Sequence, residues 1–179
     1  MTMILYTSPT GLSKAGLYSD SLVVLEDYPF MRTIFGIKIH RSKDNRFAFG
    51  FSGVHTESTF VDLAEEMIRQ YVIPNLSAAG FSGGIVVNVT DEQIKAGIET
   101  GSFIVMTRHA AHCVKVKEGT PELIIKPRST MVAIGSVGPR AMGFFTVVPD
   151  VKIMFDTLKY DDPLIGGELQ VIEQESLDE

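Results

Sequence analysis

The chain has 179 residues, of which 45% are hydrophobic and 21% are charged. These values predict one globular domain over residues 1–179 and exclude a mainly disordered, collagen-like or low-complexity protein. Its 16 basic and 22 acidic residues give a net charge of −6, so nucleic acid, whose phosphates an acidic surface repels, is not expected as a main partner. The densest basic run, residues 38–46, contains Asp44 and is interpreted as two strands joined by a solvated turn.

The sequence also predicts a compartment. The single cysteine, Cys113, cannot form an internal disulfide, and no basic N-terminal segment followed by an apolar stretch marks a secretory signal. No apolar run approaches the ~18 residues that would cross a bilayer. We therefore expect a cytoplasmic protein with no membrane partner.

The first third of the chain alternates with the two-residue period of β-strands. Turn residues at 8–11 and 42–45 separate the alternating segments, which predicts two antiparallel hairpins. The expected strands cover residues 3–7, 12–19, 34–41 and 46–53.

An amphipathic helix is predicted next. Apolar residues from Phe60 to Val72 recur with the helical period and form one face. Thr59 and Asp62 have the spacing of a capping box at its start, and Pro74 is expected to end it.

Strands return after this helix. We expect a short strand over residues 85–89 and a short helix over 91–98 with Thr90 as its N-cap. Four further strands are expected over residues 103–108, 112–118, 123–126 and 131–135.

Two helices and a last strand complete the chain. Pro139 suits the first turn of a helix that ends near residue 148, and Asp150 suits the N-cap of a second helix. A strand follows over residues 168–172, and the acidic residues 173–179 are expected to fray. Since sequential hairpins cannot supply parallel crossovers, this order predicts an α+β fold of antiparallel sheets covered by helices.

Several weak signals favour ordinary structural roles. His109 and His112 are three residues apart, so a strand places them on opposite faces, and we expect no metal site there and no cofactor. Residues 135–138 precede a helix and suit anion binding, but they lack the lysine and the length of a phosphate-binding loop. Cys113 has no recognised activating partner and is interpreted as a buried thiol.

Thr2 is a candidate nucleophile because it directly follows Met1. A small second residue permits removal of the initiator methionine, which would leave a threonine with a free α-amino group. Such an amine has a pKa near ~8, so it can accept the hydroxyl proton near neutral pH. The alternative reading is that a small residue stands at this position for translation alone.

Blocks in order along the chain resemble proteasome β-type subunits, including the bacterial HslV-type peptidase. The longest block, KIHRSKDNRFAFGFSG at residues 38–53, matches the spacing from the family's lysine to its glycine. The other blocks are TMILY at 2–6, GLYSDS at 16–21, VAIGSVGPRA at 132–141 and DPLIGG at 162–167.

This resemblance implies the N-terminal nucleophile (Ntn) hydrolase fold, a four-layer α-β-β-α sandwich of two mostly antiparallel sheets. It also implies threonine peptidase chemistry in which Thr2 attacks the peptide carbonyl. Lys38 would lower the pKa of the nucleophile system, and Asp20 would hold that lysine charged and oriented. Ser136 and Asp162 would tune the terminal amine through hydrogen bonds. Without the resemblance, a structural ion pair is the favoured explanation for Lys38 and Asp20, and a helix cap is the favoured explanation for Ser136.

The resemblance places substrate-binding groups at the end of the hairpin. The backbone N–H groups around Ser52 and Gly53 would receive the developing oxyanion. His40 and Val54 would lie near the pocket for a substrate side chain. The family also implies assembly into a ring-shaped homo-oligomer, an ATP-dependent unfoldase as a partner, and unfolded polypeptide as substrate.

A non-catalytic assembly or interaction protein with the same fold is the alternative function. Ile165 stands where the family usually has Ser or Thr, and Asp161 beside Asp162 leaves the family's aspartate uncertain by one residue. A retained Met1 would also acylate the amine that the mechanism needs. A small-molecule amidase with the same nucleophile is a third option. The peptidase is preferred because four residues of the family's pattern occur together: Thr2, Asp20, Lys38 and Ser136.

Overall fold

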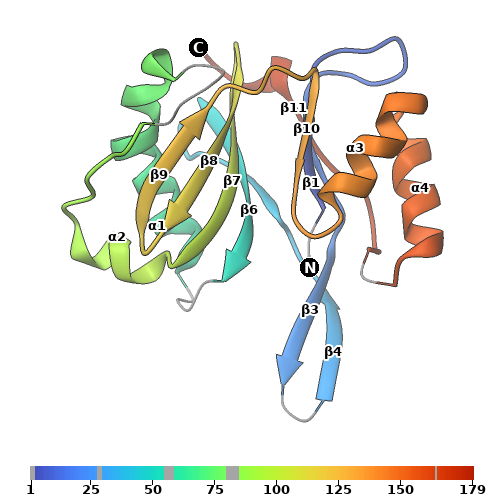
Figure 1. Cartoon of the computed structure of the whole chain (residues 1–179), viewed down its shortest axis with the longest axis horizontal. Helices are drawn as coiled ribbons and strands as arrows, with labels where there is room; N and C mark the ends of the chain where they lie inside the picture. Colours follow the sequence, from blue (N-terminus) through green and yellow to red (C-terminus); the bar gives the residue numbers. More distant parts are fainter. Residues whose placement is uncertain (1–2, 28–29, 55–58, 80–84, 164) are drawn as a thin grey trace.

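The computed structural model describes residues 3–27, 30–54, 59–79, 85–163 and 165–179. Two sheets form the centre of the molecule (Figure 1). One has the strand order β10-β1-β2-β11, the other is the meander β5-β6-β7-β8-β9, and β3 and β4 pair separately. Every described strand pair is antiparallel.

The strands have the following bounds. They are β1 (Ile4–Thr7), β2 (Gly16–Ser19), β3 (Leu22–Asp27), β4 (Phe30–Phe35), β5 (Ile39–Arg41), β6 (Phe47–Val54), β7 (Thr100–Thr107), β8 (Ala111–Lys117), β9 (Thr120–Ile125), β10 (Met131–Ile134) and β11 (Gln170–Glu173). The helices are α1 (Phe60–Met67), the π-helical turn η1 (Ile68–Val72), the 3-10 turn η2 (Ile73–Ala78), α2 (Glu92–Gly97), α3 (Gly138–Val147), α4 (Val151–Asp161) and the 3-10 turn η3 (Gln174–Ser176).

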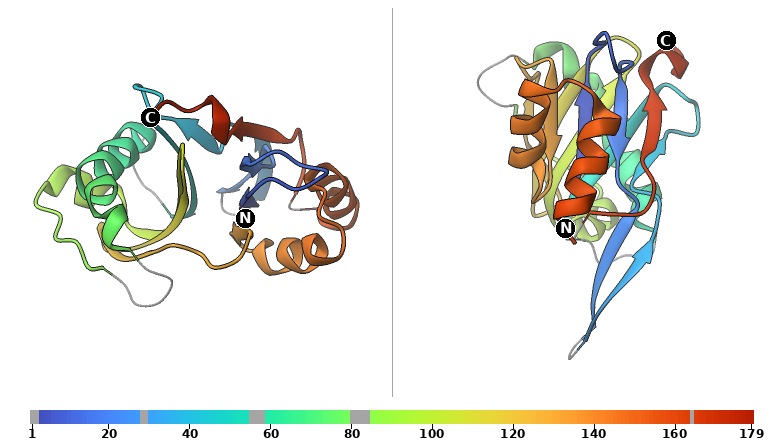
Figure 2. Two further views of the ribbon diagram at one scale, coloured as in Figure 1. Left: turned by 90° about the horizontal axis from the view of Figure 1, so that it is seen from above. Right: turned by 90° about the vertical axis from the view of Figure 1, so that its right-hand side faces the viewer.

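Helices cover the outer face of each sheet, which makes four layers (Figure 2). Between the sheets, β1 and β2 bury Ile4 and Leu17 against Ile104 and Met106 of β7. A second apolar cluster lies between the five-stranded sheet and α1 with its continuation, and a third between the four-stranded sheet and helices α3 and α4. Burial of these three apolar layers is the main force that holds the sandwich together. The predicted α-β-β-α sandwich is confirmed.

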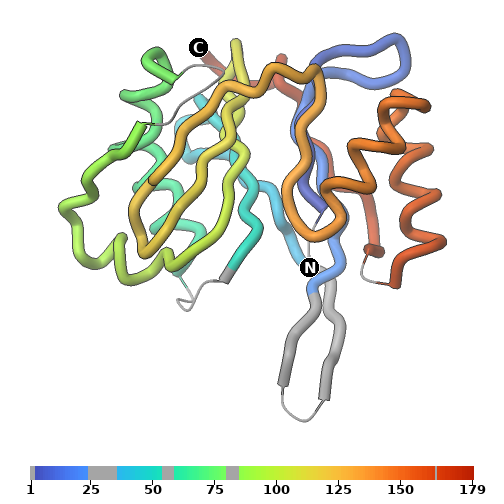
Figure 3. Tube along the Cα trace, in the orientation of Figure 1, coloured from blue at the N-terminus to red at the C-terminus, as the bar shows by residue number. Residues whose placement is uncertain are grey.

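The two ends of the chain meet in one sheet. β11 pairs with β2, with Gln170 opposite Ser19 and Ile172 opposite Leu17 (Figure 3). The last residues continue from there: Leu177 is buried between the sheets, and the Arg108 guanidinium donates to its carbonyl at 3.0 Å. These contacts hold residues 173–177 against the body of the molecule, although their acidic composition predicts a free end.

The first hairpins differ from the prediction. The strand expected over residues 12–19 begins only at Gly16, and the one expected over 34–41 divides into the end of β4 and the whole of β5. Residues 36–38 lie between these two strands, next to the site described below. The β3–β4 hairpin was not predicted, because residues 22–25 are uninterrupted apolar residues and show no alternation.

The first helix also differs from the prediction. Its α-helical part ends at Met67, and the chain continues as π and 3-10 turns to Ala78, so Pro74 does not end it. Pro74 is tolerated because it stands at the start of the 3-10 turn, where its missing N–H needs no partner. Thr59 makes no side-chain cap, so the predicted capping box is wrong.

The segment around the second helix needs two corrections. Residues 85–89 form no strand, and the buried Val89 packs instead into the cluster beneath α1. The N-cap of α2 is Asp91, whose carboxylate accepts from the backbone N–H groups of Gln93 and Ile94. Thr90 lies one residue too early, and its hydroxyl lies 3.1 Å from that of Tyr71.

Candidate active site

A buried ion pair joins the end of β2 to the start of β5. Lys38 Nζ donates to Asp20 Oδ1 at 2.7 Å. The Asp20 side chain is fully buried and the Lys38 side chain is 7% exposed. Removing two charges from water is costly, and a pair in this position needs further hydrogen bonds to satisfy its remaining oxygens.

Asp20 obtains those hydrogen bonds from two other segments. The backbone N–H of Met3 donates to Oδ1 at 3.4 Å, and that of Gly166 donates to Oδ2 at 3.3 Å. The carboxylate therefore joins the start of the chain, the Lys38 segment and the loop before β11. The residue directly after Thr2 is bound to the same carboxylate as Lys38.

The surroundings of Lys38 change its acidity. Burial lowers the pKa of Lys38 below that of an ordinary lysine, while the hydrogen bond and the charge of Asp20 act in the opposite direction. The net direction is downward, so the ammonium loses its proton more readily than an exposed lysine does. Such a group suits a role in which its charge influences a neighbouring proton transfer.

Thr2 and Met1 lie outside the described residues. The prediction that Thr2 faces Lys38 therefore stays a prediction. The structure brings two of the predicted site residues into contact, Asp20 and Lys38, and it places Met3 beside them.

Ser52 and Gly53 lie near the end of β6, where they are opposite Ser102 and Gly101 of β7. Ile39 is opposite Gly50 in the neighbouring pair, so the chain just before Ile39 runs toward this same end of β6. Gly53 has a φ of 154°, and a Cβ there would come within 2.5 Å of the carbonyl oxygen of Thr100. Only glycine fits this position. The side chain of Val54 lies outside the description.

His40 lies on the other face of β5 from Ile39. Its ring packs against Phe49 with 5.6 Å between centroids, and Phe49 belongs to the cluster under α1. Burial lowers the pKa of His40. Its predicted place beside a substrate pocket is not tested by these contacts.

Ser136 and Asp162 lie at the ends of α3 and α4, the helices that cover the four-stranded sheet. Ser136 is exposed in the turn before α3, where the preceding Gly135 has a φ of 97°. Asp162 follows the last turn of α4, and its carboxylate accepts from Arg140 at 3.1 Å. Its side chain is 16% exposed. Asp161 is the exposed one of the two neighbouring aspartates.

The residues to which the sequence analysis gave ordinary structural roles lie in different environments. His109 is exposed and lies 3.4 Å from Glu179, whereas His112 is buried in β8. Burial raises the pKa of the Cys113 thiol to about 11, so it stays protonated near neutral pH. In the ranges that the structure describes, no helix is long and apolar enough to cross a membrane.

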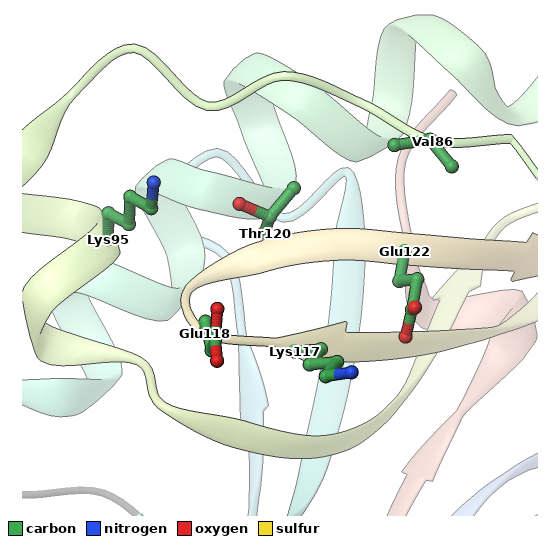
Figure 4. Close-up of a pocket in the computed structure, with 6 residues that line it drawn as sticks. All are labelled: Val86, Lys95, Lys117, Glu118, Thr120 and Glu122. Carbon is green, nitrogen blue, oxygen red and sulfur yellow. The ribbon is translucent and has the colours of Figure 1, made fainter.

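Two hollows on the surface of the described residues lie away from the ion pair. One of about 280 Å³ is formed at the β8–β9 turn and α2, at the opposite edge of its sheet from β5 (Figure 4). Lys95 and Lys117 line it together with Glu118 and Glu122. Charges of both signs in an open hollow define no ligand class.

Gln170 was not singled out in the sequence, yet its side chain contacts the segment that carries Lys38. Its carboxamide oxygen accepts from the backbone N–H of Lys38 at 3.0 Å. A lone glutamine at the start of a strand carries no motif, so no sequence signal identifies it.

Comparison with known structures bears on the fold. The chain is similar to eukaryotic HslV from Trypanosoma brucei, with 20% identity over 96% of this chain and 99% of that chain and a TM-score of 0.61. A Gly-1 mutant of Anbu from Hyphomicrobium sp. strain MC1 is 11% identical over 99% of this chain and 84% of that chain, with a TM-score of 0.56, and a second Anbu structure from that strain has a TM-score of 0.53. No protein-family model and no curated protein matches the sequence. The expected Ntn-hydrolase sandwich is thus the fold of this chain.

Proposed function

We propose that the protein is a threonine-type endopeptidase subunit in which Thr2, exposed after removal of Met1, is the nucleophile. The observation that carries this proposal is the buried Asp20–Lys38 pair, whose carboxylate also binds the amide of Met3. This pair is bound to the residue that follows the candidate nucleophile. Stability alone does not explain a buried ion pair there, since apolar residues would fill the same space at a lower cost in free energy.

The proposed reaction uses the chain's own groups. The Thr2 hydroxyl oxygen bonds to the peptide carbonyl carbon while its proton passes to the α-amino group, directly or through water. The Lys38 ammonium favours the deprotonated oxygen, and Asp20 holds that ammonium in place. Backbone N–H groups around Ser52 and Gly53 stabilise the oxyanion. The C–N bond then breaks, the leaving amine takes the proton, and water hydrolyses the ester.

The remaining roles extend this proposal. Ser136 and Asp162 tune the terminal amine, and His40 and Val54 border the pocket for a substrate side chain. The subunits form a ring-shaped homo-oligomer in the cytoplasm that confines the sites, because an exposed unspecific peptidase would digest its surroundings. An ATP-dependent unfoldase supplies unfolded polypeptide. The similarity of the fold to HslV and Anbu supports this assembly.

A non-catalytic assembly protein is the second candidate, and one observation favours it. Ile165, where the family usually has a hydroxyl, is 3% exposed and packs into the apolar cluster under α3 and α4. A buried isoleucine supplies no hydrogen bond to a terminal amine.

Covalent labelling separates the two candidates. We expect the intact mass of the purified protein to lack Met1, and a peptide epoxyketone, which reacts with both a hydroxyl and a free amine, to add to Thr2. Lys38→Ala should abolish this adduct, while Lys43→Ala, at an exposed lysine in the next turn, should leave it unchanged. Full-length mass with no adduct would favour the non-catalytic protein.

A further inference from the structure

Gln170 connects three segments that surround the ion pair. It is the first residue of β11 and is half-buried. Its carboxamide oxygen accepts from the Lys38 backbone N–H and from the Ser19 hydroxyl, both at 3.0 Å. Its amide nitrogen donates to the Gly36 carbonyl at 2.8 Å. Its three partners are therefore Lys38 itself, the residue before Asp20, and a residue two positions before Lys38.

The carboxamide of Gln170 takes the place of a missing neighbouring strand. In an extended segment the carbonyl of one residue and the N–H of the second residue after it point to the same side, where one residue of a parallel strand would bind both. Gln170 binds this combination at Gly36 and Lys38. Ile37, between them, is 73% exposed.

These contacts set the backbone on both sides of the ion pair. Ser19 precedes Asp20, and the bonded N–H belongs to Lys38 itself, so one amide oxygen bridges the chains that carry the two charged groups. We propose that Gln170 is a positioning residue that holds Lys38 against Asp20 and thereby controls the protonation of Lys38. This inference rests on the proposed function, because that protonation matters for catalysis only if Thr2 reacts.

The physical effect of losing Gln170 follows from the burial of Lys38. Without the carboxamide, residues 36–38 lose both hydrogen bonds to β11, so we expect this segment to move and to expose Nζ to water. Since burial is what lowers the pKa of Lys38, access of water should return that pKa toward the ordinary value of about 10.4. In any reaction that uses Lys38, the limb of the pH profile that reports its ionisation should move with it.

The test compares Gln170, the half-buried first residue of β11, with Gln174, the buried residue that directly follows β11. Gln170→Met keeps the length of the side chain and removes its polar atoms. Gln174→Met is the matched control. Gln174 accepts from the Tyr6 hydroxyl and donates to the Thr107 carbonyl, both at 2.8 Å, and among the described residues its side chain makes no hydrogen bond to Asp20 or Lys38. The full chain, labelled with ¹⁵N-lysine, is titrated by NMR at Lys38 Nζ, and the pH profile of epoxyketone labelling is recorded in parallel.

We expect Gln170→Met to raise the pKa of Lys38 by about half a unit or more and to move the labelling profile toward higher pH, while Gln174→Met changes neither. An unchanged Lys38 pKa in folded Gln170→Met would overturn the positioning role. If Gln170→Met does not fold, Gln170→Asn, whose shorter side chain keeps its polarity but cannot reach both groups, is judged by the same criterion. The NMR titration needs no peptidase activity, so absence of an adduct in the unaltered protein would count against the proposed function and not against Gln170.

Discussion

Two charged networks in this molecule use similar side chains in different surroundings. Asp20 and Lys38 are both almost fully buried, and the carboxylate also binds two backbone N–H groups. At the turn after β5, Arg69 of η1 binds Asp44 at 2.5 Å and Glu65 at 2.7 Å, but the side chains of Arg69 and Asp44 are 36% and 37% exposed.

The difference lies in what each network fixes. The Arg69 network attaches the 42–46 turn to the helix above it, and Glu65 also accepts from the backbone N–H of Lys43 at 2.7 Å. Glu65 is buried, but the Arg69–Asp44 pair is exposed, and water and salt weaken such a pair, so its contribution is structural and modest. The Asp20–Lys38 pair is desolvated and strongly sensitive to the loss of one partner. Burial, more than the identity of the charges, separates a candidate site from a surface contact.

Removing one buried charge should produce the largest effect. Asp20→Asn keeps the shape of the side chain but leaves the Lys38 ammonium buried without a counter-charge, and we expect a loss of about 3 kcal/mol in the free energy of unfolding. Asp44→Asn, at the exposed pair, should lose less than about 1 kcal/mol. Urea unfolding at pH 7 measures both. Equal losses in the two variants would contradict the distinction drawn from burial.

A substitution at His112, a buried histidine, should change the stability of the protein by an intermediate amount. It examines burial of a titratable group that no opposite charge accompanies among the described residues. His112 is 5% exposed, and its Nδ1 has no hydrogen-bond partner in the part of the chain that the structure describes. Burial first, and then the charge of Lys126, lower the pKa of His112. The folded state thus favours neutral His112, so stability is complete above the unfolded pKa of about 6.5 and falls as the pH drops below it.

The corresponding experiment compares His112→Leu with the unaltered protein in urea at pH 7.5 and pH 5.5. We expect His112→Leu to lose less stability on acidification, by a fraction of the effect of Asp20→Asn, because no buried group then gains a charge at that position. His109→Leu, at a histidine that is 73% exposed, serves as the control and should retain the normal dependence. A His112→Leu variant with the unaltered pH dependence would show that this histidine does not contribute.

The sequence predicts most of this fold because its elements have one buried face. The apolar residues that recur from Phe60 onward, and the alternation along β6 to β8, mark the residues of that buried face. The β3–β4 hairpin is missed because residues 22–25 are uninterrupted apolar residues and show no such period. Residues 85–89 are mostly β-branched and so favour a strand, although the structure forms none there.

The site was predictable only in part. Asp20 and Lys38 are 18 residues apart, and no general spacing rule joins them; the resemblance of whole blocks to a known family did so. Gln170 lies on the last strand, and its importance depends on the β2–β11 pairing, which brings the end of the chain beside its start. Tertiary neighbours of this kind carry no local pattern in a single sequence.

The smallest expected effect concerns the cause of the acidity of Asp44. The hydrogen bond from the Ser42 hydroxyl, ahead of the Arg69 contact, lowers the pKa of Asp44 to about 2. A carboxyl with a lowered pKa contributes stability that is present above its unfolded value of about 4 and is lost as the pH falls through the folded value. Ser42→Ala should therefore move the Asp44 titration, followed by carboxyl NMR, further toward 4 than Arg69→Met does. If Arg69→Met has the larger effect, the exposed ion pair dominates this turn, and the contrast with the buried pair at Lys38 becomes one of degree.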